Sequence, residues 1–323
     1  MLKYLISFWI VVCMSLAQAW QPPAVVKVIV GQSPGGGNEF AFRGISPILE
    51  KNYPDTKFIF EYVRGLDNVI AMNHFAEQRS DGSSILVVVQ ATGFVAAPVA
   101  YASKLKVDPM NYTSVTSLAK SPMAFVVSKN SKFNSVPQLI EYIKNKNKLN
   151  IGVSGSINLL VYGYLLDQLG ASTSQVQAIR YNSPTDASLA AATDIIDVAI
   201  VPLSVPKPLI DSGRLRLLSH TGSSVIPGLD SVAMMKNYIP GLVLDANWSV
   251  FLPPNTADEI ADWYQSAFLQ AISVESARQY YNNNWATIDK SSQGKKNLDE
   301  SIKLLRQQWI PTANKVIKED NTQ

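Results

Sequence analysis

Residues 25–44 read VVKVIVGQSPGGGNEFAFRG and place a glycine-rich loop between a strand and a helix. The β-branched run at 25–30 predicts a buried strand, and the apolar spacing at 40–52 predicts a helix. Glycine has no side chain and tolerates positive φ, so the glycines at 35–37 let a ligand approach the backbone N–H groups ahead of the helix. The stretch therefore predicts a cradle for a carboxylate or phosphate. The glycines alone leave open the alternative that the loop is only a tight turn.

The alternation of strand and helix continues along the chain. We expect strands at residues 25–30, 57–63, 84–90, 123–128, 149–154, 176–181, 197–202, 215–220 and 247–253, and helices at 40–52, 69–79, 136–146, 157–170, 257–273 and 298–317. Continuous Val, Ile and Leu runs are typical of parallel strands covered by helices on both faces. Two such α/β units without a flexible tether predict two lobes joined by crossing strands. Ligands of such sheets bind outside the carboxyl ends of the strands, here in a cleft between the lobes.

Composition excludes several classes of protein. The chain has 323 residues, of which 47% are hydrophobic and 16% are charged, so it can bury two medium-sized cores and is not disordered. Its formal net charge is +3, and its basic residues cluster only at 144–148 and 295–296. This pattern indicates neither nucleic-acid binding nor a polybasic membrane patch.

The first 20 residues have the pattern of an export signal. An apolar run at 5–16 follows a single lysine, and the small-residue pattern Ala-Gln-Ala precedes Trp20, so we expect residues 1–19 to be a signal peptide that is cleaved on export. A membrane anchor is the alternative, but the run is short for a hydrocarbon core of about 30 Å. Cys13 is the only cysteine, so the mature chain would have no disulfide and no thiol site.

A second loop, GVSGSIN at 152–158, also lies between an expected strand and a helix, and it offers the hydroxyls of Ser154 and Ser156. Two such loops could hold a ligand across the cleft. The sequence nearly matches the G-x-S-x-G nucleophile elbow, but Ser156 stands where the last glycine belongs. His74 and His220 are the only candidate bases, and we expect both to be structural. With two histidines and no mature cysteine, we expect no metal and no cofactor, and phosphate-loop and dinucleotide motifs are absent.

Several stretches, in order along nearly the whole mature chain, resemble the tripartite tricarboxylate transporter substrate-binding proteins, also called the Bug family. They are residues 26–43, 80–88, 181–200, 212–219 and 247–260. The resemblance implies a two-lobed periplasmic binding protein of the Venus-flytrap kind, with a type II-like arrangement and no catalytic role. Such a protein captures a small organic carboxylate and presents it to a membrane permease.

The expected organisation follows from that architecture. We expect lobe 1 to comprise residues 20–121 and 225–323, and lobe 2 to comprise residues 122–224. The protein is expected to act as a monomer with the permease subunits of a tripartite transporter. The alternative partner is a membrane sensor to which the protein would report its ligand, and a secreted hydrolase is a distant third possibility.

The resemblance also implies ligand-binding residues by position. They are Gly35, Gly36, Gly37, Asn38, Glu39, Phe40, Gln90, Ala91, Thr92, Ser154, Gly155, Ser156, Tyr181, Asn182, Ser183 and Asp197. Glu39 replaces the usual aspartate, and Asn182 replaces the lysine of a Tyr-Lys-Gly turn. Residues 64–68 read Arg-Gly-Leu-Asp-Asn where the family usually has Pro-Gly-Ala-Gly-Gly, so we expect this loop to change the size and polarity of the pocket.

Overall fold

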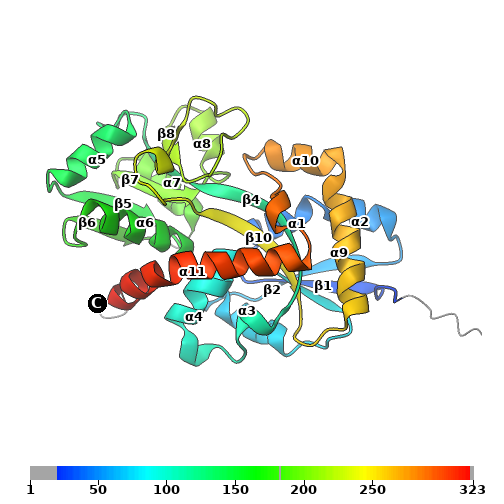
Figure 1. The fold of residues 1–323 in the computed structure, drawn as a ribbon. Helices are drawn as coiled ribbons and strands as arrows, with labels where there is room; N and C mark the ends of the chain where they lie inside the picture. The colour runs from blue at the N-terminus through cyan, green and yellow to red at the C-terminus, as the bar shows by residue number, and fades with distance from the viewer. Residues whose placement is uncertain (1–19, 182, 321–323) are drawn as a thin grey trace, which may run out of the picture.

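A mixed ten-stranded sheet runs through the molecule, in a computed structural model that describes residues 20–181 and 183–320 (Figure 1). The strand order is β2-β1-β3-β10-β4-β7-β5-β6, with β8 beside β4 and β9 beside β8. The strands are β1 Val25–Val30, β2 Lys57–Tyr62, β3 Ser84–Val89, β4 Thr113–Ser128, β5 Leu149–Val153, β6 Val176–Arg180, β7 Val198–Pro202, β8 Leu215–His220, β9 Ala233–Met234 and β10 Asp245–Leu252.

Strand β4 divides this sheet into two halves. Its 16 residues pair with antiparallel β10 at positions 113–122 and then with antiparallel β7 and β8 at 123–128. In the first half β1 lies parallel between β2 and β3, and in the second half β5 lies parallel between β6 and β7. The expectation of largely parallel α/β units is thus confirmed, while the antiparallel β4 and β10 were not expected.

Helices cover both halves of the sheet (Figure 1). They are α1 Gly37–Arg43, α2 Ser46–Asn52, α3 Val69–Ala76, α4 Ala97–Ala100, α5 Val136–Lys144, α6 Ser156–Leu169, α7 Pro184–Ala192, α8 Lys207–Asp211, α9 Asp258–Ser273, α10 Glu275–Asn282 and α11 Lys295–Asp320. Shorter turns are the 3-10 turns η1 Leu66–Asn68, η3 Ala102–Lys104, η4 Pro109–Asn111, η5 Met235–Asn237 and η6 Lys290–Ser292, and the π-helical turn η2 Ala91–Ala96.

The single helix expected at 40–52 is wrong, because the chain breaks into α1 and α2 at Gly44. The hydroxyl of Tyr281 donates to the carbonyl of Ala41 at 2.6 Å and takes an acceptor that a continuous helix would use. A Cβ at Gly44 would lie 2.4 Å from the Tyr281 ring, so the tyrosine also requires glycine there. A residue distant in the sequence therefore ends this helix.

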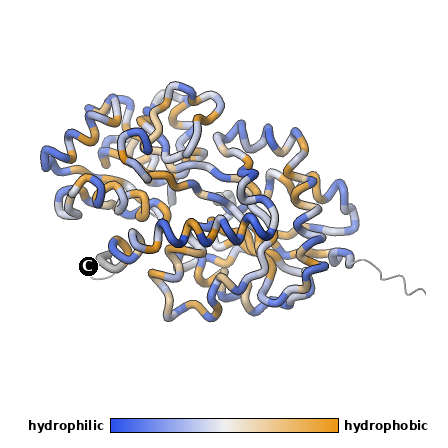
Figure 2. The backbone as a smooth tube through the Cα atoms, viewed as in Figure 1, coloured by the Kyte–Doolittle hydropathy of each residue, from blue (hydrophilic) through white to orange (hydrophobic). Residues whose placement is uncertain are grey.

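One large apolar core joins the two halves. It includes side chains of both half-sheets and the inner face of α11, where Trp309 and Ala313 are fully buried. Helix α11 begins near the first half, crosses the molecule and ends against α6 of the second half (Figure 1). Figure 2 shows hydrophobic residues concentrated on the inner strands and hydrophilic residues along most of the visible face of α11. Helix α11 thus connects both halves on one side of the sheet.

The export-signal prediction falls on residues 1–19, which lie outside the described part of the chain. Within residues 20–181 and 183–320, none of the helices combines the length and the apolar composition that a membrane crossing requires.

Candidate ligand-binding site

The glycine loop satisfies most of its own donors. The N–H of Gly35, whose φ is +80°, donates to Glu39 Oε2 at 2.7 Å. The N–H of Gly36 donates to a carbonyl of the same loop at 3.0 Å, and the N–H of Asn38 donates to Gln32 Oε1 at 3.0 Å. The expectation that all these amides face a ligand is therefore corrected. Among the amides of residues 35–38, that of Gly37 is the one for which the described residues provide no acceptor.

Glu39 anchors this loop from inside. Its carboxylate is buried, and it accepts hydrogen bonds from the Tyr62 hydroxyl at 2.8 Å and from Arg43 Nε at 2.5 Å, in addition to the Gly35 N–H. Burial alone would raise the pKa of Glu39, but these hydrogen bonds outweigh it and lower the pKa below its usual value of 4.5. The carboxylate thus sits where the sequence led us to expect the ligand's oxygen.

Trp248 supplies a donor beside the start of α1. A Cβ at Gly37 would lie 3.1 Å from Trp248 Nε1, and this buried indole N–H has no acceptor among the described residues. Trp248 stands on β10 opposite Val89 at the carboxyl end of β3, and its ring packs edge-on against Phe40 at 5.7 Å. Buried indole N–H groups usually have a partner. The sequence analysis missed Trp248, although it lies within the resembling stretch 247–260.

The second loop presents polar groups at the start of the 14-residue helix α6. Gly155 has a φ of +80°, and the hydroxyl of Ser154 is buried without a partner among the described residues. The N–H of Ser156 donates to Asp67 Oδ2 at 3.0 Å. The N-terminus of α6 therefore already holds a carboxylate, and that carboxylate belongs to the chain itself.

The loop at 65–68 connects the two glycine loops. Asn68 accepts a hydrogen bond from Asn38 Nδ2 at 3.2 Å and packs against Gly31, where a Cβ would lie 2.1 Å from its Oδ1. Its neighbour Asp67 reaches α6. Burial raises the pKa of Asp67, and Ser156 and the positive charge of Arg180 oppose that rise. Polar contacts thus run from α1 through this loop to α6.

Gln90 faces away from these loops. Its side-chain amide donates to Ser249 Oγ at 2.9 Å and accepts from Ser301 Oγ at 3.2 Å. It lines a cavity of about 450 Å³ beneath α11, together with Lys120 and Trp309. Ala91 and Thr92 follow as buried residues of the π-helical turn η2. Such turns are frequent at functional sites.

Asp197 lies at the wrong end of its strand to join the site. Its carboxylate accepts the N–H of Asn150 at 2.9 Å and lies 3.7 Å from Lys132 Nζ. These groups stand at the amino ends of parallel strands β5 and β7, whereas Ser154 follows the carboxyl end of β5. The expected role of Asp197 at the ligand was read from its position in the sequence, and the strand direction separates it from the other residues.

The turn after β6 lies beside the second loop. The N–H of Tyr181 donates to the carbonyl of Val153 at 2.9 Å, immediately before Ser154. Ser183 caps α7 by accepting the N–H of Asp186 at 3.1 Å, so its hydroxyl serves the helix. Asn182 lies outside the described residues.

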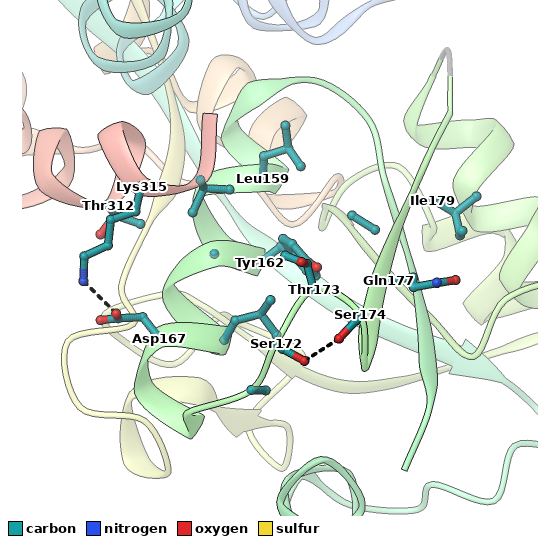
Figure 3. A pocket seen from close by; sticks show the side chains of 15 residues that line it. Leu159, Tyr162, Asp167, Ser172, Thr173, Ser174, Gln177, Ile179, Thr312 and Lys315 are labelled. Carbon is teal, nitrogen blue, oxygen red and sulfur yellow. Dashed lines mark hydrogen bonds and ion pairs between the residues drawn. The ribbon is translucent and has the colours of Figure 1, made fainter. Parts of the chain in front are cut away.

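A larger cavity, of about 720 Å³, lies between α6, the segment at 171–179 and the end of α11 (Figure 3). Lys315 and Asp167, which both line it, form an ion pair at 2.7 Å (Figure 3). None of the expected site residues lines it. The expected loops are instead linked through residues 65–68, since Asn68 contacts Asn38 and Asp67 contacts Ser156.

The candidate catalytic and metal-binding groups do not assemble. His74 pairs with Glu61 at 2.7 Å, and buried His220 accepts the N–H of Gly222 at 3.1 Å, so within the described residues neither contacts Ser154. Residues 20–181 and 183–320 contain no group of three His, Cys, Asp or Glu side chains placed to hold a metal ion.

Comparison with solved structures places the fold. A malate-bound MatC from Rhodopseudomonas palustris superposes with a TM-score of 0.78 at 18% identity, over 90% of this chain and 98% of that one. Rpa4515 of R. palustris with adipate superposes with a TM-score of 0.81 at 20% identity, over 91% of this chain and 97% of that one. The periplasmic binding protein BugD superposes with a TM-score of 0.78 at 18% identity, over 90% of this chain and 97% of that one. The expected mixed α/β periplasmic-binding-protein fold is confirmed.

Sequence comparison identifies the family. A UPF0065 protein of Cupriavidus necator is 25% identical over 267 residues, which are 80% of this chain and 77% of that protein. A UPF0065 protein of Bordetella bronchiseptica is 25% identical over 256 residues, or 76% and 72%. Residues 49–309 match the family described as the tripartite tricarboxylate transporter family receptor. The chain therefore belongs to this family of solute-binding receptors, which are not enzymes.

Proposed function

We propose that this receptor binds a small organic carboxylate between the loops at 35–38 and 154–156 and delivers it to the membrane permease of a tripartite transporter. One observation carries the proposal: the buried Nε1–H of Trp248 has no acceptor among the described residues and lies against Gly37. Leaving a buried donor unpaired costs about 1 to 3 kcal/mol, and a carboxylate oxygen would remove that cost. The first turn of α1 adds a favourable local dipole.

The comparison structures support the choice of ligand class. Two proteins of the same fold hold malate and adipate, as their descriptions state. The buried hydroxyl of Ser154 offers a further hydrogen-bonding group from the second loop. Delivery to a permease is proposed because the family is that of a transporter's receptor.

We also propose that the two halves are lobes, residues 20–121 with 225–323 and residues 122–224, which part to admit the ligand. Strand β4 passes between them near Pro122, where its pairing changes from β10 to β7. The second crossing lies between the end of β8 and the start of β10. Because only a few chain segments connect the two halves, hinge motion between them is possible.

Export to the periplasm with cleavage before Trp20 is part of the same proposal. The backbone nitrogen of Trp20 lies 2.7 Å from Glu259 Oε1, and its ring packs edge-on against Trp263 at 5.4 Å. A free amino group at this position would form an ion pair with Glu259. The relatives of this fold include a protein described as periplasmic.

Replacing Trp248 by Phe tests the proposed contact. The ring remains while the donor disappears, so carboxylate affinity should fall by about ten- to a hundredfold, the equivalent of one hydrogen bond to a charged group. Calorimetric titration with the carboxylate that most raises the melting temperature measures this change.

Trp309→Phe is the matched control, because the Nε1 of Trp309 is also buried without a partner among the described residues but belongs to α11. It should leave the affinity unchanged. Equal affinities for Trp248→Phe and the wild type, with both proteins folded, would contradict the proposed contact.

A further inference from the structure

The chain's own carboxylate occupies the α6 end of the cleft. Asp67 Oδ2 accepts the N–H of Ser156, the first residue of α6, at 3.0 Å. The other Asp67 oxygen would lie 3.5 Å from a Cβ at Gly155. Asp67 is half-buried and belongs to the first half of the molecule, whereas α6 belongs to the second. It therefore bridges the two halves beside the second loop.

The backbone holds Asp67 in this position by an uncommon conformation. Leu66, Asp67 and Asn68 have φ values of 45°, 52° and 77° and follow Gly65 at 126°. Side chains other than glycine rarely adopt such values, at a cost of roughly 1 to 3 kcal/mol each. The hydrogen bond from Asn38 to Asn68 and the contact between Asp67 and Ser156 offset part of this conformational cost.

We propose that Asp67 determines the charge of the ligand, by taking the α6 donor that a second ligand carboxylate would need. This inference rests on the proposed binding of a carboxylate at the α1 loop. Two carboxylates at one N–H would repel each other, and such like-charge contacts across an interface cost several kcal/mol. The ligand is therefore a monocarboxylate, and its far end is uncharged or carries a hydrogen-bond donor such as an ammonium group.

The remaining polar groups at this end agree with that assignment. The hydroxyl of Ser154 is more than nine-tenths buried and has no partner among the described residues, and the equally buried hydroxyl of Ser156 lies beside the Asp67 carboxylate. A hydroxyl oxygen accepts from an ammonium or amide N–H as readily as it donates. Together with the Asp67 carboxylate, these oxygens form an acceptor-rich end opposite the donor-rich end at Gly37 and Trp248.

Matched six-carbon acids test the proposal directly. Hexanoate, 6-aminohexanoate and adipate share one chain and differ only at the far end, and the four-carbon series butyrate, 4-aminobutyrate and succinate repeats the comparison. Calorimetry should show that the wild type binds the amino acid or the simple monoacid more tightly than the diacid. In Asp67→Asn, diacid affinity relative to the monoacid of equal length should rise by about tenfold or more. Asparagine has the same shape and tolerates positive φ, so the loop should keep its conformation.

Asp197→Asn is the matched control, since Asp197 also accepts a backbone N–H but at the other end of β5. It should leave the ratio of diacid to monoacid affinity unchanged. Unaltered selectivity in a folded Asp67→Asn variant would overturn the proposal. An equal rise in affinity for all acids would also overturn it, because Asp67 would then only compete with any ligand. Binding of no acid by either protein would instead contradict the proposed function itself.

Discussion

At the scale of single residues, Glu39 shows why the N–H donors of a glycine-rich loop need not be available to a ligand. Its carboxylate takes the Gly35 N–H that the sequence analysis assigned to a ligand. The sequence predicted the glycine loop, but nothing in the local sequence indicates that Glu39 turns back into its own loop. The distant hydroxyl of Tyr62 completes that arrangement.

The Glu39 network should make stability depend on pH. Because the folded-state pKa of Glu39 is lowered, its ionised form stabilises the protein fully above pH 4.5, and this contribution is lost as the pH falls through the folded-state pKa. At pH 7, Glu39→Gln should lower the free energy of unfolding by about 1 to 3 kcal/mol, because glutamine replaces one of the two acceptor oxygens with an NH₂ donor and carries no charge. Chemical denaturation at several pH values measures the difference.

The difference between wild type and Glu39→Gln should shrink as the pH falls below 4.5. Glu77→Gln serves as the control, because Glu77 pairs with Lys106 at an exposed site, where ion pairs contribute little. A Glu39→Gln penalty that stays constant from pH 7 to pH 3 would show that the ionised carboxylate is not what stabilises the loop.

Glycine requirements at the loop also depend on distant side chains. Gly36 has φ −72° and ψ 168°, values that any residue adopts, so its conformation does not demand glycine. Gly37 is the position at which a Cβ would press on an indole, 3.0 Å from Trp248 Cζ2. Three consecutive glycines predict a ligand loop, but the sequence alone does not say which of them faces the ligand.

At the scale of elements, the strands with continuous apolar runs were predicted within a few residues, and the missed elements had weaker patterns. Helix α7, PTDASLAAA, is rich in alanine and lacks apolar spacing, so it was not expected. The first ten residues of β4 were missed because Thr, Ser and Lys interrupt their apolar run. Strand β4 is buried because other strands pair along it and α9, α11 and α7 pack against it, and only the tertiary structure reveals that.

The contact between α6 and α11 depends on Gly163. A Cβ there would lie 1.8 Å from Val316 Cγ2, so α11 would have to move. Gly163→Ala should lower the free energy of unfolding by about 1 to 3 kcal/mol, although alanine normally favours a helix interior. Thermal and chemical denaturation measure the change, and adding Val316→Ala should restore most of the loss.

Lys315→Ala is the comparison at the same contact, because it removes the half-exposed ion pair with Asp167. Such a pair contributes at most about 1 kcal/mol. If Gly163→Ala instead raised the melting temperature, helix propensity would outweigh packing, and α11 would not be seated tightly on α6.

At the scale of the whole molecule, the fold and family followed from the order of the strands and the resembling stretches, whereas the chemistry of the cleft did not. Parallel strands bring Ser154 and Tyr181 to one end, and they carry Asp197 to the other. The loop at 64–68 stood out in the sequence as a departure, but its bridging role required the structure. Residues that meet across the two halves are not neighbours in any local pattern.

Closure around a ligand links binding to stability. A ligand at 100 times its dissociation constant stabilises the folded chain by about 2.7 kcal/mol. If the two halves part as proposed, the contact between Asp67 and α6, which joins them, would break on opening and re-form on closure. A melting-temperature screen therefore identifies acids worth titrating, and calorimetry then measures their affinities.

The central claim is that the cleft binds its ligand through a carboxylate group, and one calorimetric comparison tests it most directly. The wild type is titrated with the best acid of the screen and with the corresponding primary amide, which has nearly the same shape but no charge. We expect the acid to bind and the amide to bind at least about a hundredfold more weakly, because charged acceptors form the stronger hydrogen bonds with the Gly37 and Trp248 donors. Equal affinity for acid and amide, or binding of neutral sugars with no response to any acid, would contradict the account.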